Sequence, residues 1–319
     1  MAELSSLAGL IFSRDRALQL DAALRSFLLH CEDGSRLPLS VLYRTTSPLH
    51  ARQYAELAEA YHSYTNIQFQ EQSHFRQDVL AWLAGYAGLR RGAGLYRRVA
   101  RLHWRLGFLG TWLLRFDRPR YVLFLVDDTL FVQDFKLTQA LAVLDGQPRA
   151  LGFSLRLGRN AIYSYTRDMH QCLPELTPAG EQVLIYNWQQ AELDFAYPLE
   201  VSSSIFRIAD LLPFLNRQRF TNPNQLESRL AENTQLFANR TYLLCYEQSV
   251  AFSNPVNQVA ERYQNRAGTV YSYTSQDLAE MFAQGMRVDV AAFSGFVPQG
   301  CHQEVELHFR RLAGSADVS

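Results

Sequence analysis

The chain has 319 residues and 48% hydrophobic content, enough to bury the core of one large α/β domain or of two closely packed halves. Lys plus Arg and Asp plus Glu both number 31, so no net basic charge favours nucleic acid, and we expect no nucleic-acid partner. The four cysteines are far apart and form no CxxC pair, which excludes a zinc ribbon and a redox dithiol.

The N-terminus, MAELSSLAGLIF, has an acid where a secretory signal needs a base, and it runs directly into a strand pattern. No stretch reaches the ~18 consecutive apolar residues of a transmembrane helix. We therefore expect a cytoplasmic protein.

Strands and helices alternate along the first 132 residues. Apolar runs predict strands at 7–12, 39–43, 67–69 and 121–126, and helical spacing of apolar residues predicts helices at 20–28, 51–61 and 75–83. Asp15 is the expected N-cap of the first helix. This alternation predicts an α/β fold with a mostly parallel, doubly wound sheet of the Rossmann type, flanked by helices, whose strand ends meet at one crevice.

A stretch of mixed arginine and apolar residues at 89–116 interrupts this alternation. Arg97, Arg98, Arg101 and Arg105 are interleaved with leucine and tryptophan, which favours a basic amphipathic helix or helical pair. It is either an ordinary covering helix with solvated arginines or a site of peripheral contact with the anionic inner face of a membrane.

The remaining chain, 133–319, has a less regular pattern. It predicts helices at 135–144, 209–215 and 275–285 and strands at 150–155, 183–186, 199–206 and 242–246, with no period in 158–178. Asn222-Pro223 and Asn254-Pro255 are typical helix starts, and apolar residues as far as Phe237 continue the first of these helices. No clear linker separates the two halves of the chain.

Two carboxylates, Asp127 and Asp128, directly follow the buried strand 121–126. Adjacent carboxylates repel each other, and the carboxyl end of a strand is where an open α/β sheet places its ligand crevice. A divalent cation is the simplest partner for the pair; a capped turn with a solvated Asp128 is the alternative. A phosphatase of the haloacid dehalogenase type is excluded, because its motif would put Leu125 in the place of the nucleophilic aspartate.

Three short motifs occur in a characteristic order: FSRDR at 12–16 after the first strand, VLYR at 41–44 and VDD at 126–128. In this order they resemble nucleotide-sugar-dependent glycosyltransferases of the GT-A fold. The resemblance implies one GT-A-like domain, with 1–132 as the half that binds the nucleotide sugar and 133–319 as the acceptor-binding half. The implied activity is metal-dependent transfer of a sugar from a UDP or GDP sugar to a glycan or a lipid-linked acceptor, as in polysaccharide biosynthesis.

The resemblance also implies a metal site. Mn²⁺ or Mg²⁺ would be bound by Asp128, with Asp127 contacting the ion, its waters or the ribose. The family typically has a second aspartate two positions after the first, whereas this chain has Thr129 there. His302, in the sequence GCHQE, is the candidate third ligand, and an imidazole would favour Mn²⁺.

The nucleotide would lie at the end of the first strand. Ser13 and Arg14 would contact the base and ribose, Arg16 the diphosphate, and Tyr43 would stack on the base. Tyr43 packed within the sheet is the alternative.

An inverting transferase also needs a general base. Glu227, in NPNQLE, occupies the place of the acid that such enzymes carry, although the usual Glu-Asp pair is absent; Asp194 and Glu200 are the other candidates. Alternatively, Glu227 only stabilises the dipole of its helix. A retaining enzyme would need no such base.

Two other functions remain open. A sugar nucleotidyltransferase also joins such a sheet to a metal-binding aspartate, but its phosphate loop is normally rich in glycine, and FSRDRALQL has none. A non-catalytic carbohydrate-binding protein would not need paired aspartates after a buried strand.

Overall fold

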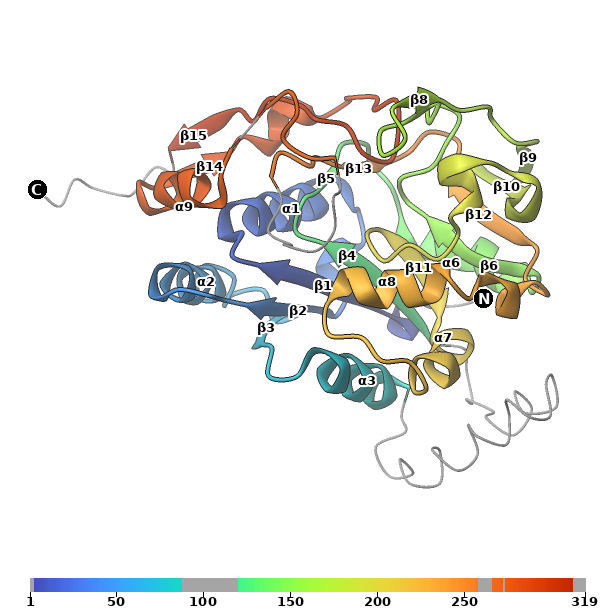
Figure 1. The fold of residues 1–319 in the computed structure, drawn as a ribbon, viewed down its shortest axis with the longest axis horizontal. Coiled ribbons are helices and arrows are strands. Elements are labelled where there is room, and N and C mark those ends of the chain that lie inside the picture. Colours follow the sequence, from blue (N-terminus) through green and yellow to red (C-terminus); the bar gives the residue numbers. More distant parts are fainter. Residues whose placement is uncertain (1–2, 88–119, 258–265, 272, 312–319) are drawn as a thin grey trace, which may run out of the picture.

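A computed structural model describes residues 3–87, 120–257, 266–271 and 273–311. Its centre is one sheet with the strand order β3-β2-β1-β4-β11-β6-β12-β10-β9 (Figure 1). The strands of the first half are mutually parallel and lie where the sequence predicts them: β1 (Leu7–Arg14), β2 (Leu39–Arg44), β3 (Ile67–Glu71) and β4 (Tyr121–Val126). The predicted Rossmann-type arrangement is confirmed in this half.

The second half extends the same sheet with mixed directions. β11 (Ser204–Arg207) runs antiparallel to both β4 and β6 (Ala150–Ser154), and β12 (Tyr242–Tyr246) runs parallel to β6. β10 (Val183–Asn187) and β9 (Thr177–Gly180) complete the edge as antiparallel strands. Because β11 pairs with β4, strands from both halves of the chain form one continuous sheet.

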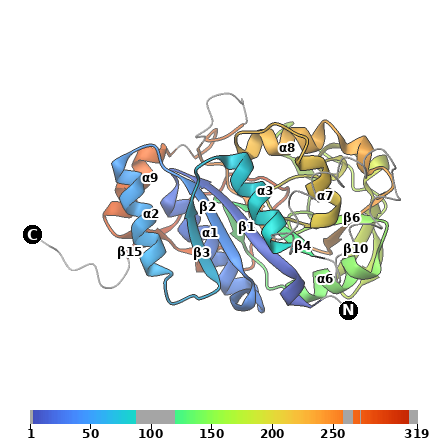
Figure 2. The ribbon, with the colours of Figure 1, turned by 90° about the horizontal axis from the view of Figure 1, so that it is seen from below.

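Helices cover both faces of the sheet (Figures 1 and 2). Alternate residues of β4 explain this: Leu123 and Leu125 belong to one core, whereas Val122 and Phe124 belong to the other. The first core includes apolar residues of α1 (Ala17–His30), α2 (Pro48–Ala60), α6 (Leu137–Gly146) and α9 (Ser275–Ala283). The second includes those of α3 (Phe75–Tyr86), α7 (Ile208–Leu215) and α8 (Pro223–Ala231). The α/β fold class is confirmed.

The beginnings of two helices show where cap prediction succeeded and where it failed. α8 begins as predicted, because Asn222 accepts a hydrogen bond from the backbone of Gln225 and Pro223 occupies the first turn. The prediction that Asp15 caps α1 was wrong. The N-cap is Arg16, and the carboxylate of Asp15 instead accepts hydrogen bonds of 2.8 Å from the backbone N–H and the hydroxyl of Thr46.

Three further predictions need correction. The region 158–178 contains a small hairpin of β7 (Tyr163–Ser164) and β8 (Met169–His170). α8 ends at Ala231, and Phe237 lies in a separate 3-10 turn, Thr234–Phe237. Residues 254–257 are not helical, because the carboxamide of Asn254 pairs with the backbone N–H and C=O of Val305 instead of capping a helix.

Four short strands complete the described chain. β5 (Thr129–Phe131) pairs with β13 (Ala251–Ser253), and β14 (Met286–Val288) pairs with β15 (Phe309–Arg311). β5 directly follows Asp127 and Asp128, so the acidic pair lies between β4, a strand of the central sheet, and β5, which pairs with β13.

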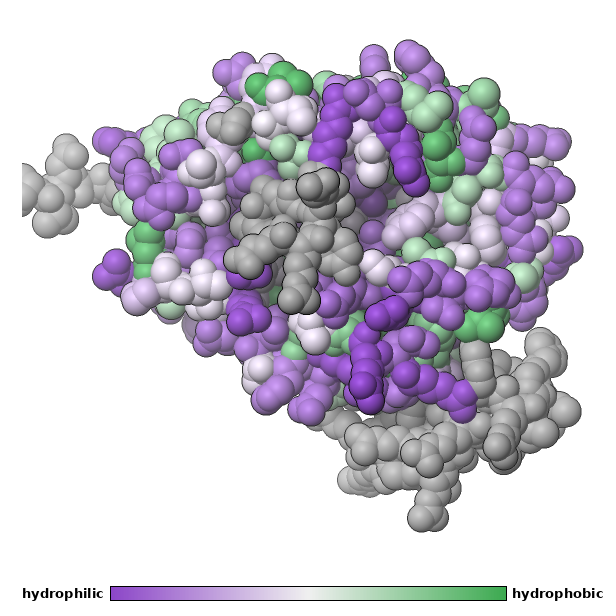
Figure 3. All heavy atoms as spheres, viewed as in Figure 1, coloured by the Kyte–Doolittle hydropathy of each residue, from purple (hydrophilic) through white to green (hydrophobic). Residues whose placement is uncertain are grey.

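The arginine-rich stretch 89–116 lies outside the described residues. Among the described helices, none combines the length and the apolarity needed to cross a bilayer. On the face seen in Figure 3, hydrophilic residues prevail among those coloured, and apolar residues are scattered between them.

Candidate active site

A cavity of about 880 Å³ opens where β1 and β4 end. Its volume lies in the range of cavities that bind small molecules and cofactors. Its walls come from both halves of the chain, including the loop after β1, the acidic pair after β4, the start of α8 and the segment around His302. This is the carboxyl edge of the parallel strands, where the sequence predicts the crevice.

Both carboxylate oxygens of Asp127 accept hydrogen bonds from the loop after β1. Its Oδ1 accepts a hydrogen bond of 3.0 Å from the guanidinium of Arg16, and its Oδ2 accepts from the hydroxyl of Ser13 at 2.8 Å and the backbone N–H of Arg14 at 3.1 Å. The structure thus brings together five of the predicted residues, because Asp128 also lies 3.4 Å from Arg16. The cation between the two carboxylates is a guanidinium, which offsets their repulsion.

Asp128 has one carboxylate oxygen that could bind a ligand. Its Oδ1 is buried and has no hydrogen-bond partner among the described residues. Burial raises the pKa of this carboxyl, and the charge of Asp127 adds to the effect, whereas Arg16, Arg156 and the hydroxyl of Ser253 oppose it. Mg²⁺ is commonly bound by one or two carboxylates together with substrate phosphates. Asp128 therefore fits such an ion, whereas both oxygens of Asp127 are already occupied.

His302 lines the cavity but is held by an arginine. Its Nε2 lies 3.2 Å from Nη1 of Arg156. A guanidinium can only donate, so Nε2 accepts and the proton of the neutral ring is on Nδ1. Burial, together with the charge of Arg156, lowers the pKa of His302 to about 3, so the ring is neutral at pH 7.

The three predicted metal ligands do not form one cluster. Within the described residues, no three side chains of His, Cys, Asp or Glu lie close enough together to hold a metal ion. Asp127 is tied to Arg16, and His302 is tied to Arg156. Of the predicted set, only Asp128 has a carboxylate oxygen without a partner.

Most of the predicted nucleotide contacts line the cavity, but Tyr43 does not. Ser13, Arg14 and Arg16 belong to its wall. The ring of Tyr43 instead stacks on the buried Tyr54, with centroids 4.6 Å apart. Tyr54 in turn forms hydrogen bonds with Ser13 and with the backbone N–H of Arg16. Through this contact with Tyr54, Tyr43 stabilises the loop after β1 and does not face the cavity.

Glu227 points into the cavity from the first turns of α8. Its Oε2 accepts from the backbone N–H of Val201 at 2.8 Å, and its Oε1 accepts from the hydroxyl of Tyr197 at 3.2 Å. Burial raises the pKa of Glu227, the neighbouring Glu200 raises it further, and the Val201 N–H, Arg156 and Tyr197 oppose the rise. A carboxylate with a raised pKa inside a cavity has the properties of a general base.

The two other candidate bases, Asp194 and Glu200, differ in the partners that their carboxylates already have. Asp194 lines the cavity and accepts from the hydroxyl of Ser164 at 2.8 Å; burial raises its pKa, and that hydrogen bond opposes the rise. Glu200 is paired with Arg156 at 2.9 Å and accepts from the backbone of Ser203 at 3.1 Å. The carboxylate of Glu200 thus forms an ion pair with a buried guanidinium, which Glu227 does not contact directly, so Glu200 is less suited as the general base.

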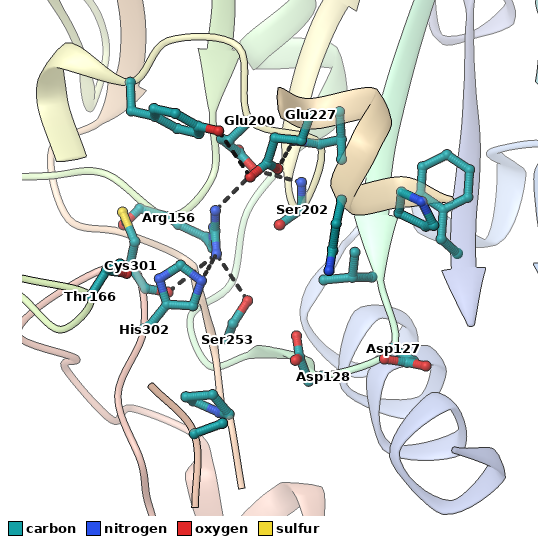
Figure 4. Close-up of a pocket in the computed structure, with 18 of the residues that line it drawn as sticks. Asp127, Asp128, Arg156, Thr166, Glu200, Ser202, Glu227, Ser253, Cys301 and His302 are labelled. Atoms are coloured by element: carbon teal, nitrogen blue, oxygen red, sulfur yellow. Dashed lines mark hydrogen bonds and ion pairs between the residues drawn. The ribbon is translucent and has the colours of Figure 1, made fainter. Parts of the chain in front are cut away.

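Arg156 is a site residue that the sequence analysis missed. It follows β6 and is 3% exposed, yet it lines the cavity (Figure 4). The signal was the single charged residue in the mostly apolar run ALGFSLRL at 150–157, because a charged residue in such a run needs a buried partner. Gln72, after β3, and Tyr197 also line the cavity, and no spacing pattern marks either of them.

Glu304 fastens one wall of the cavity. Its carboxylate accepts from the backbone N–H groups of Thr269 (2.8 Å), Val270 (2.6 Å) and Tyr271 (3.0 Å), and from the hydroxyl of Tyr165. Burial opposes ionisation, but these hydrogen bonds outweigh it and lower the pKa of Glu304 to about 2. The segment held in this way includes Arg266, which lines the cavity.

We expect Glu304→Gln to lower the free energy of unfolding at pH 7 by about 1–3 kcal/mol, because the amide leaves buried N–H groups without an acceptor. A depressed folded pKa stabilises the protein above the ordinary value of 4.5, and this contribution is lost as the pH falls toward 2. The difference between variant and wild type in urea denaturation should therefore shrink between pH 5 and pH 2. Glu306→Gln, an exposed neighbour, is the control; an equal effect there would contradict the assignment.

Comparison with known proteins adds a sequence relative. No family model matches the chain. Among curated proteins, it is 23% identical over 281 residues to the bifunctional glycosyltransferase pgtA of Dictyostelium discoideum. The resemblance to glycosyltransferases is confirmed. The match covers 80% of this chain and 32% of the relative, so the chain spans about a third of that protein's length.

Solved glycosyltransferase structures show a partial similarity. S. aureus TarS has a TM-score of 0.43 at 13% identity, covering 78% of this chain and 36% of that one. The TarS 1–349 complex with UDP-GlcNAc has a TM-score of 0.42 at 12% identity, covering 90% and 66%. The bifunctional WbbM has 0.33 at 15% identity, covering 71% and 37%. These scores are below 0.5, so the fold of this chain is defined by its own strand order alone.

Proposed function

We propose that this chain is a glycosyltransferase that transfers a sugar from a nucleoside-diphosphate sugar to a glycan or a lipid-linked acceptor. The observation that carries the proposal is the content of one cavity: an acidic pair at the carboxyl end of β4, the guanidinium of Arg16 between its members, and a carboxylate, Glu227, with a raised pKa. The sequence similarity to a protein named as a glycosyltransferase supports it.

The donor would lie against the first half of the chain, 1–132, as a UDP or GDP sugar. Arg14 and Arg16 line the cavity there and provide positive charge for a diphosphate. Leu42, Gln72 and Phe75 line the same part of the wall and offer apolar surface and one carboxamide to a nucleobase. A Mn²⁺ or Mg²⁺ ion, held by Asp128, would neutralise negative charge on the departing diphosphate as a Lewis acid.

The acceptor would lie against the second half, 133–319, where Glu227, Asp194 and Tyr197 line the cavity. Its hydroxyl oxygen forms a bond to the anomeric carbon, the bond from that carbon to the diphosphate oxygen breaks, and the hydroxyl proton passes to Glu227. Attack from the side opposite the leaving group inverts the anomeric configuration. For a lipid-linked acceptor, we further propose that a cytoplasmic enzyme contacts the inner membrane face peripherally through 89–116.

The proposal is tested by incubating the protein with UDP sugars and GDP sugars, with Mn²⁺ or Mg²⁺, and measuring release of the nucleoside diphosphate. We expect release from one nucleotide class, by slow hydrolysis or by transfer to added glycans. Release of pyrophosphate from a nucleoside triphosphate and a sugar phosphate would instead identify a nucleotidyltransferase. If sugars bind without turnover of any nucleotide, the protein is a carbohydrate-binding module.

A further inference from the structure

One buried cation connects the polar groups of the cavity. Nη2 of Arg156 donates to Oε2 of Glu200 at 2.9 Å, and its Nη1 donates to the hydroxyl of Ser253 at 2.9 Å and to Nε2 of His302 at 3.2 Å. Figure 4 shows the guanidinium between Glu200 and Glu227 on one side and Ser253 and His302 on the other. Contacts in opposite directions fix its position.

The partner of Arg156 is equally fixed. Glu200 accepts from the backbone N–H groups of Ser202 and Ser203 and from the hydroxyl of Ser204, in the turn that leads into β11. It is 8% exposed. The Arg156–Glu200 ion pair is therefore a rigid dipole in the wall of the cavity and cannot swing toward solvent.

Glu227 lies within the field of this ion pair without a direct hydrogen bond to it. The charged and titratable groups that act on Glu227 are Glu200, Arg156 and Tyr197, and its direct partners are the hydroxyl of Tyr197 and the backbone N–H of Val201. Glu200 disfavours the charged form of Glu227, whereas Arg156 favours it. The charges of Glu200 and Arg156, both fixed in place, thus have opposite effects on the ionisation of Glu227.

We propose that Arg156 is a positioning residue, which together with Glu200 sets the charge state of Glu227 and therefore the lowest pH at which the enzyme works. This inference rests on the proposed function, in which Glu227 accepts the proton of the acceptor. It assigns no contact between Arg156 and the substrate. The two members of the ion pair then have opposite effects when each is neutralised.

Because the two substitutions should shift the ionisation of Glu227 in opposite directions, an electrostatic effect can be told apart from damage to the fold. Without the cation, the Arg156→Gln variant holds Glu227 next to an uncompensated Glu200, so Glu227 ionises only at higher pH. Without the anion, the Glu200→Gln variant leaves Arg156 facing Glu227 alone, so Glu227 ionises at lower pH. Distortion of the cavity would impair both variants but has no reason to move them in opposite directions.

The test compares the acidic limb of the pH profile of kcat/KM for the wild type and these variants. We expect the limb to move to higher pH in Arg156→Gln and to lower pH in Glu200→Gln, with Arg156→Lys lying nearer the wild type. Each pH unit of displacement is about a tenfold change in rate on that limb. Unmoved limbs, or limbs displaced in the same direction, would overturn the inference.

Arg207→Gln is the matched control for losing a buried arginine. Arg207 is 9% exposed and donates to the carbonyl of Ala150 at 2.7 Å, outside the cavity wall. We expect Arg207→Gln to lower the free energy of unfolding but to leave the acidic limb of the pH profile of kcat/KM where it is in the wild type. If Arg156→Gln does not fold, Glu200→Gln is compared with the double variant Arg156→Gln/Glu200→Gln. Both members of the ion pair are neutral in the double variant, so neither is left as an unpaired charge. These two proteins differ only at position 156, and the comparison therefore isolates the effect of the arginine.

A second readout separates this inference from the proposed function. The carboxyl of Glu227 is titrated by NMR in substrate-free protein labelled at glutamate, and its signal is assigned by its loss in Glu227→Gln. If the titration moves as expected but the wild type turns over no nucleotide sugar, the proposed function fails while the coupling stands. If turnover requires Glu227 but neither titration nor limb moves, the inference fails alone.

Discussion

Glu227→Gln is expected to lower kcat for sugar transfer at least about a hundredfold, in line with the contribution of a positioned general base. The amide cannot take the acceptor proton, yet its oxygen can still accept the 2.8 Å hydrogen bond from the Val201 backbone. Burial already disfavours the charged form of Glu227, so a neutral side chain suits the site and the free energy of unfolding should not fall. Initial-rate measurements should show KM for the donor unchanged.

Glu232→Gln is the control for this prediction. Glu232 follows the same helix, α8, and its exposed carboxylate pairs with Arg229 at 2.7 Å. We expect wild-type kcat from it. If Glu227→Gln also kept wild-type kcat, the general base would be another group, or the enzyme would be a retaining one.

The second large effect concerns Asp128. Asp128→Asn should lower kcat/KM for the nucleotide sugar at least about a hundredfold, because even indirect partners of a metal ion contribute 10- to 100-fold to its binding. The carboxamide keeps the shape of the side chain but loses the charge of the buried Oδ1, which has no partner among the described residues. We expect excess Mn²⁺ to restore little of the loss. Rates measured over a series of Mn²⁺ concentrations check this.

Asp127 is not suitable for the same test. Its removal would leave Arg16 buried with only the more distant Asp128 as counter-charge, and breaking a buried pair costs about 3–5 kcal/mol. Asp210→Asn is the better control: this partly buried aspartate forms an ion pair of 2.9 Å with Arg240 outside the cavity wall. If Asp210→Asn and Asp128→Asn lowered kcat/KM equally, loss of stability would explain both.

Sequence patterns predicted the first half of the fold well because each element there has one clear period. β4 is a continuous apolar run with both faces covered, and its predicted and observed bounds agree. The second half was harder. β11 is shorter than predicted, because the turn around Glu200 occupies part of the apolar stretch with hydrogen bonds from Ser202 and Ser203. The helix expected after Asn254 is absent from 254–257 because a distant residue, Val305, takes its carboxamide.

The site was predictable where function depends on strand ends. Asp127, Asp128 and the loop after β1 meet because parallel strands end at the same edge. Tyr43 has the same sheet position but packs against Tyr54, and no local pattern separates a ring that stacks on a base from one that packs on another ring. Arg156 was missed because its partners lie far from it in the chain, at 200, 253 and 302.

Calorimetric titration of UDP and GDP, with and without Mn²⁺, on the wild type and on Asp128→Ala measures whether the cavity binds a nucleotide through a metal ion held by Asp128. We expect one of the two nucleotides to bind the wild type, the binding to require the metal, and Asp128→Ala to abolish it. If neither nucleotide bound under any metal condition, and no other nucleoside diphosphate did, the protein would not be a nucleotide-sugar-dependent transferase.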